Sequence, residues 1–147
     1  MEFVAGTRIH QCEQSDHPPA GQVSACCDSA FRLKRPGSCD HPGVPNFGRW
    51  GISAQKRNRD PLTWEDIKEE IRSARPIAFS LMDMAEKYSH MMVIVGYVET
   101  PGENFIQYLS PEFEHEPEVQ LATYRWYLGN AEPEGLAKHQ YDYYLIE

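Results

Sequence analysis

The stretch from Ser89 to Tyr97, SHMMVIVGY, places a histidine at the head of an apolar run that closes in a glycine. No residue from Met91 to Gly96 can hold a charge, so the run predicts a β-strand that is buried on both faces. His90 is then a polar side chain held at the end of a rigid core strand, where catalytic side chains are commonly mounted. The alternative is a structural histidine that only satisfies its own hydrogen bonds.

A second apolar segment follows the first after a short turn. The turn has Pro101 and Gly102 at its centre, and Asn104 to Leu109 follows it, so the two segments predict an antiparallel hairpin. In a hydrolase that uses cysteine and histidine, the histidine needs a thiolate partner and usually an Asn or Asp that orients it. The end of the second segment offers only Leu109 and Ser110 for this orienting role.

The composition favours one globular domain. The chain has 147 residues, of which 41% are hydrophobic and 12% aromatic, and its formal net charge of −8 argues against a general nucleic-acid surface. No apolar run reaches the roughly 18 residues that a membrane span needs, and no signal peptide is visible after Met1. Acidic residues crowd one loop, which we interpret as solvated: Glu112, Glu114, Glu116 and Glu118.

The four cysteines lie together in a segment rich in proline and glycine, at Cys12, Cys26, Cys27 and Cys39. Such a segment has little regular structure to hold it, so crosslinks are an attractive explanation. Two disulfides are expected, with the adjacent pair taking different partners, and they would imply a secreted or extracytoplasmic protein. Zinc, with His17 and His41 nearby, and free thiols are the alternatives. No Cys-x-x-Cys pair is present, and reduced cysteines would instead indicate the cytoplasm.

The clearest predicted helix begins after Thr63. Asp66 follows three residues later, as in a capping box, and Arg75 and Pro76 end the helix. Its apolar face is expected to be core, whereas Lys68 is expected to face water. The apolar positions are Trp64, Ile67, Ile71 and Ala74.

Three further segments complete the predicted α+β fold. Ile77 to Leu81 predicts a strand, Val119 to Leu128 a strand or a short helix, and Tyr141 to Ile146 a final strand. Together with the hairpin, they predict one main helix packed on a mostly antiparallel sheet of four or five strands.

In their order along the chain, several phrases resemble the bacterial papain-like cysteine peptidases, a family related in fold to the peptidase domains of bacteriocin-processing transporters. The resemblance covers nearly the whole chain and implies one papain-like domain over residues 1–147. Residues 1–60 would form its crosslinked, loop-rich part and residues 61–147 its helix and sheet. The phrases are Gln11 to Glu13, Cys26 with Cys27, Cys39, LTWEDIKEEI, RPIAFSL, SHMMVIVGY and residues 141–144.

The resemblance assigns His90 the position of the catalytic base. The orienting residue, which the family usually carries in an Asn-Asp-Pro phrase, maps onto Leu109, Ser110 and Pro111. Ser110 is therefore the candidate orienter, although a hydroxyl acts at best like an amide there. The family nucleophile lies upstream of the position of Cys12, and Glu2 to Gly6 resembles the end of its helix. A preceding N-terminal segment or a companion chain would then supply the nucleophile.

A second candidate nucleophile is Cys27, because ACCDSAF resembles the nucleophile phrase of papain itself. A helix that began at Cys27 and ran through Leu33 would favour the thiolate. Pro36 and Gly37 leave barely two turns for such a helix.

These observations predict a papain-like cysteine peptidase that is incomplete or degenerate in this chain. The first alternative is an inactive pseudopeptidase, which binds peptides or proteins without covalent chemistry because thiolate and imidazole act as a unit. The second is an unrelated crosslinked α+β domain in which His90 is structural. The expected partner is a peptide or protein rather than nucleic acid, and neither a cofactor nor a metal is expected.

Overall fold

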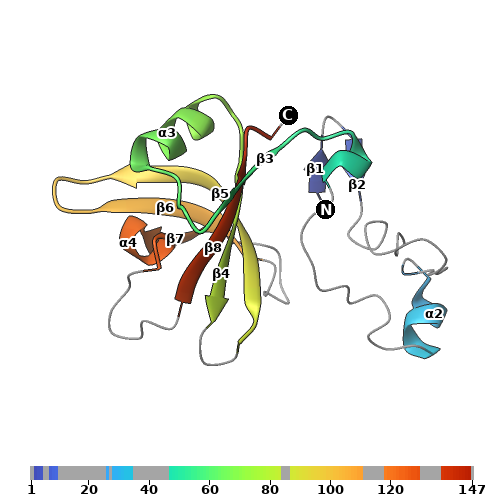
Figure 1. Cartoon of the computed structure of the whole chain (residues 1–147). Coiled ribbons are helices and arrows are strands. Elements are labelled where there is room, and N and C mark those ends of the chain that lie inside the picture. The colour runs from blue at the N-terminus through green and yellow to red at the C-terminus, as the bar shows by residue number, and fades with distance from the viewer. Residues whose placement is uncertain are drawn as a thin grey trace. The chain divides into compact units, whose positions relative to one another are not determined.

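The computed structural model describes residues 2–4, 7–9, 26, 28–34, 47–83, 87–110, 118–129 and 137–146. The chain divides into two compact units, Met1–Ile52 and Ser53–Glu147 (Figure 1). No helix in these described ranges is long and apolar enough to cross a membrane.

The first unit begins with two short strands. β1 (Glu2–Val4) and β2 (Thr7–Ile9) pair antiparallel, with Glu2 opposite Ile9. The expectation that the chain opens at the end of a helix is therefore wrong for Glu2–Val4, which form a strand. Helix α2 (Ser29–Lys34) and the 3₁₀ helix η1 (Phe47–Trp50) follow.

One of the four cysteines lies in the described part of the first unit. Cys26 is fully buried and disulfide-bonded. Helix α2 begins at Ser29 rather than at Cys27, and the Asp28 carboxylate accepts a hydrogen bond from the Ala30 N–H at 2.8 Å. Cys12, Cys27 and Cys39 lie outside the described residues, as do Pro111 and the glutamates at 112, 114 and 116.

The second unit is built on a six-stranded antiparallel sheet with the order β3-β8-β4-β5-β6-β7 (Figure 1). The prediction of one main helix on a mostly antiparallel sheet is confirmed in this coarse form. β8, the last strand in the chain, lies between β3 and β4. The strands are β3 (Gln55–Asn58), β4 (Ile77–Asp83), β5 (Ser89–Glu99), β6 (Asn104–Leu109), β7 (Gln120–Thr123) and β8 (Ala137–Tyr144).

Helix α3 (Trp64–Arg72) starts as predicted. Thr63 Oγ1 accepts from the Asp66 N–H at 3.2 Å, and Asp66 Oδ2 accepts from the Thr63 N–H at 3.1 Å. The expectation that Lys68 faces water is wrong, because the residue is only 8% exposed. Its ammonium lies 2.7 Å from Glu65 and 3.0 Å from Glu99 at the end of β5, so the carbon stem covers the sheet while the charge stays paired.

The core lies on one face of the sheet. Its fully buried side chains include Ile67 from α3, Tyr127 from α4 (Tyr124–Tyr127), and Phe79 and Ile94 from the sheet. We call the face that carries Phe79 and Ile94 the helix face, and the opposite one the outer face. Neither α3 nor α4 packs on the outer face.

Burial along β5 corrects the prediction of a strand buried on both faces. Met92 and Ile94 are buried on the helix face, whereas Val95 on the outer face is 38% exposed. The pairing register with β6 shifts between Ile94 and Gly96. At Gly96 an added Cβ would collide with the side chain of Gln107.

Candidate functional site

His90 and Ser110 meet at one end of the β5–β6 hairpin. His90 lies near the start of β5, directly opposite Leu81 of β4, and Ser110 comes immediately after β6. His90 Nε2 lies 2.8 Å from Ser110 Oγ, which is hydrogen-bonding distance. Ser110 is 6% exposed, and His90 is half-buried. The fold thus brings together two residues that the sequence singled out separately.

The hydroxyl partner sets what this histidine can do. A serine Oγ can accept a proton from Nε2 or donate one to it, depending on the tautomer, and either hydrogen bond fixes the orientation of the imidazole ring. It carries no charge, so it does not stabilise an imidazolium as a carboxylate would. The hydrogen bond to Ser110 therefore orients the His90 ring without adding a negative charge from the serine.

No thiolate is placed beside this pair by the described residues. Cys26 cannot act as a nucleophile while it is held in a disulfide. Cys27, the other candidate, lies outside the described ranges. The described residues thus bring together the candidate base and the candidate orienter, His90 and Ser110.

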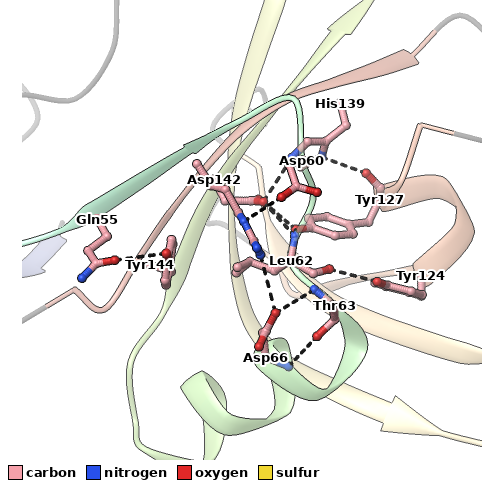
Figure 2. A network of polar contacts seen from close by, with 11 residues as sticks. Gln55, Asp60, Leu62, Thr63, Asp66, Tyr124, Tyr127, His139, Asp142 and Tyr144 are labelled. Atoms are coloured by element: carbon pink, nitrogen blue, oxygen red, sulfur yellow. Dashed lines mark hydrogen bonds and ion pairs between the residues drawn. The ribbon is translucent and has the colours of Figure 1, made fainter.

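A second histidine lies in a buried polar network that sequence reasoning missed (Figure 2). The Asp142 side chain, fully buried on β8, accepts hydrogen bonds through Oδ2 from the Tyr127 hydroxyl at 2.8 Å and from the Leu62 N–H at 3.1 Å. His139 Nε2 lies 3.2 Å from the same oxygen. Among the residues that the structure describes, Oδ1 of Asp142 has no partner.

Both ring nitrogens of His139 face oxygen atoms of the buried network. Its Nδ1 lies 3.0 Å from the carbonyl oxygen of Tyr127, which can only accept, so Nδ1 must donate. Nε2 lies 3.2 Å from Asp142 Oδ2, so both ring nitrogens of His139 are within hydrogen-bonding distance of a buried oxygen. Burial, together with the negative charge of Asp142, holds the pKa of Tyr127 well above its usual value, so its hydroxyl remains a donor.

Sequence reasoning missed this network because it depends on a change in the pairing register between β8 and β4. In a regular strand, His139 and Asp142 would point to opposite faces because their separation is odd. Asp142 lies opposite Phe79 and His139 opposite Leu81, with a register shift between Ser80 and Leu81. This irregularity brings both side chains onto the helix face. The network links β8 to α4 and to Leu62, the residue before the N-cap of α3. Because solvent does not reach these groups, the network has a structural role.

A shallow pocket of about 170 Å³ lies beside α3, next to β3 and the end of β8. It is well below the roughly 300 Å³ at which small-molecule sites begin. Its charges are largely paired: Arg57 lies 3.1 Å from Asp60 and 3.6 Å from Asp66, and the Glu70 carboxylate binds Arg75 and the Leu145 N–H. No group of three or more potential metal ligands occurs in the described part of the chain. The lining residues are Arg57, Leu62, Asp66, Glu69, Glu70 and Tyr144.

No protein-family model, curated protein or solved structure matches this chain. Function has to be argued from the His90–Ser110 pair and from the residues around it.

Proposed function

We propose that this chain is a papain-like cysteine peptidase module in a degenerate form. His90 holds the position of the base and Ser110 orients it. One observation carries the proposal: a histidine at the start of one strand is hydrogen-bonded, at 2.8 Å, to the residue that follows the next strand. The resemblance to the peptidase family assigns the base and the orienter to these same two places.

The chemistry of the pair supports a weakened rather than an intact catalytic unit. In an intact unit, the imidazole takes the proton of the thiol and is then stabilised as an imidazolium while the thiolate attacks the peptide carbonyl. Ser110 fixes the ring but supplies no negative charge. A thiol brought to His90 would therefore be activated less than it would be beside a histidine oriented by aspartate.

A second candidate function is a pseudopeptidase that binds extended peptides without cleaving them. The disulfide at Cys26 favours it, because it removes one of the two adjacent cysteines from thiolate chemistry. The peptide would then bind beside His90 without forming an acyl-enzyme.

The first experiment combines a thiol count with a hydrolysis assay. The protein is alkylated in the native state and again after denaturation without reductant, and the labelled cysteines are counted by mass spectrometry. Wild type, His90→Ala and the matched control Ser89→Ala are then incubated with a mixture of fluorogenic peptides. Ser89 is exposed on the same strand, so its replacement leaves the pair untouched.

The degenerate module predicts no reactive native thiol and no hydrolysis. Ring signals of His90 in an NMR titration with the same peptides should nevertheless shift, which would mark the bound peptide. Hydrolysis that His90→Ala abolishes and Ser89→Ala preserves would show an active peptidase and overturn the degenerate assignment. If His90 signals do not move and no peptide is cleaved, the peptidase relationship itself fails.

A further inference from the structure

The two edge strands of the sheet are built differently. β3, at one edge, has the sequence QKRN and is polar throughout. Its Lys56 ammonium lies 4.4 Å from the ring centre of Tyr141 and 5.3 Å from that of Tyr143, and Arg57 is paired with Asp60. Lysine and arginine on an edge strand disfavour the addition of another strand, so this edge is protected.

The opposite edge, β7, lacks such protection. Its sequence, QLAT, contains no charge and no proline, and on its inner side it pairs with β6 from Phe105 to Tyr108. No strand in the described part of the chain pairs with its outer side. Leu121 in the strand is 56% exposed and Val119 just before it is 57% exposed. An edge strand of this kind offers unpaired backbone N–H and C=O groups to another extended chain.

Exposed apolar side chains also occur on the outer face of the sheet, farther from the β7 edge. Leu121 lies opposite Gln107, and Thr123 opposite Phe105, which is in turn opposite Val98. Val95 and Val98 on β5 are among the large hydrophobic side chains that remain exposed. The exposed apolar side chains therefore extend from β5 to the free edge, where a further strand would cover Leu121.

Charged residues flank the two ends of β7 and would favour one orientation of an added strand. Glu118 precedes the strand and Arg125 follows it, and both side chains are exposed. An antiparallel strand added to this edge would place its C-terminal end beside Glu118 and its N-terminal end beside Arg125. A segment with an acidic N-terminal side and a basic C-terminal side is complementary to that order.

We propose that the outer edge of β7 binds an extended peptide as a seventh, antiparallel strand. Backbone hydrogen bonds to β7 would hold the peptide. Its alternate apolar side chains would lie beside Leu121 on the outer face, and its terminal charges would fix its direction. This inference goes beyond the proposed function, because it requires neither a thiol nor the His90–Ser110 pair.

The test uses a synthetic peptide with acetylated and amidated ends and the sequence Glu-Thr-Val-Thr-Val-Thr-Lys. Binding to the ¹⁵N-labelled protein is followed by NMR and by calorimetry. We expect saturable shifts at the Gln120–Thr123 amides and binding about tenfold weaker for Leu121→Lys, which puts a charge beside the apolar side chains of the added strand. A lysine introduced at the other edge, Asn58→Lys, is the control and should leave the affinity unchanged. A peptide N-methylated on alternate residues should not bind, because it lacks the backbone donors.

Three outcomes would overturn this inference: no saturable binding, shifts that map away from β7, or equal affinity for wild type and Leu121→Lys in proteins with matching circular dichroism. A dimer in sedimentation equilibrium that Leu121→Lys dissociates would also overturn it, because a second copy would then occupy the edge. If His90→Ala still binds the peptide, binding at the β7 edge is independent of the proposed peptidase site. Each proposal can therefore be refuted without refuting the other.

Discussion

His90 and His139 flank the same residue, Leu81, from neighbouring strands on the helix face, yet their environments are opposite. His139 is buried, and its two ring nitrogens face the Asp142 carboxylate and a backbone carbonyl. His90 is half-buried and meets the hydroxyl of Ser110. The histidine that faces a carboxylate is sealed in the core, and the histidine that faces the Ser110 hydroxyl lies nearer to solvent. A histidine–aspartate pair is thus a sign of function only where a substrate can reach it.

The largest effect should follow from removing the carboxylate. Asp142→Ala leaves the Tyr127 hydroxyl without its acceptor and removes the oxygen that faces the buried His139 ring, so the free energy of unfolding should fall by about 3 kcal/mol or more. Urea denaturation followed by circular dichroism measures the loss. Asp60→Ala is the control, since the Asp60 carboxylate is largely exposed and should contribute far less. Equal losses for the two variants would contradict the structural role of the network.

An intermediate effect is expected at Tyr127. Tyr127→Phe removes the hydroxyl that donates to Asp142 at 2.8 Å and should cost about 1 to 2 kcal/mol at neutral pH.

The pH dependence gives this prediction a second measurement. The pKa of Tyr127 is raised in the folded protein, so its contribution is complete below the tyrosine pKa of the unfolded chain, about 10, and is lost as pH rises above it. Urea denaturation at pH 8 and pH 10.5 should show a smaller alkaline loss for Tyr127→Phe than for wild type or for Tyr88→Phe, whose side chain is exposed. Parallel curves for all three proteins would rule out this linkage.

The smallest effect on stability is expected at His90. His90→Ala should lower the free energy of unfolding by less than about 1 kcal/mol and leave the fold intact, because the side chain is only half-buried and its hydrogen bond to Ser110 joins it to an uncharged hydroxyl. Thermal unfolding beside Ser89→Ala measures it. If His90→Ala lowered the free energy of unfolding as much as Asp142→Ala, both histidines would have a structural role and the contrast between them would be wrong.

The sequence predicted correctly those elements that depend on interactions between residues close together in the chain. The cap at Thr63, the strand that begins near His90 and its hairpin partner are all defined by residues close together in sequence. The hydrogen bond between His90 and Ser110 follows from that hairpin. The papain-like assignment stays a prediction that rests on the resemblance.

Features that depend on distant pairing could not be predicted in this way. β3 carries no apolar alternation, and it is a strand because Gln55 to Asn58 pair with Tyr144 to Tyr141 at the far end of the chain. The ion pair of Lys68 with Glu99 joins a helix to the end of a strand 31 residues later. The His139–Asp142 contact needs an irregularity in β8 that no spacing rule signals, because residue periodicity describes only regular strands.

The place of β8 has a consequence for biosynthesis. Because this strand separates β3 from β4, neither can complete its pairing until residues 137–144 have left the ribosome. During translation the β5–β6 hairpin can form early. Until β8 emerges, one edge of β4 stays unpaired and β3 has no partner strand. The sheet therefore closes late and through contacts distant in sequence, which slows folding and exposes strand edges to misassembly. A chaperone that shields nascent strands should matter more for this protein than for one whose last strand is at an edge.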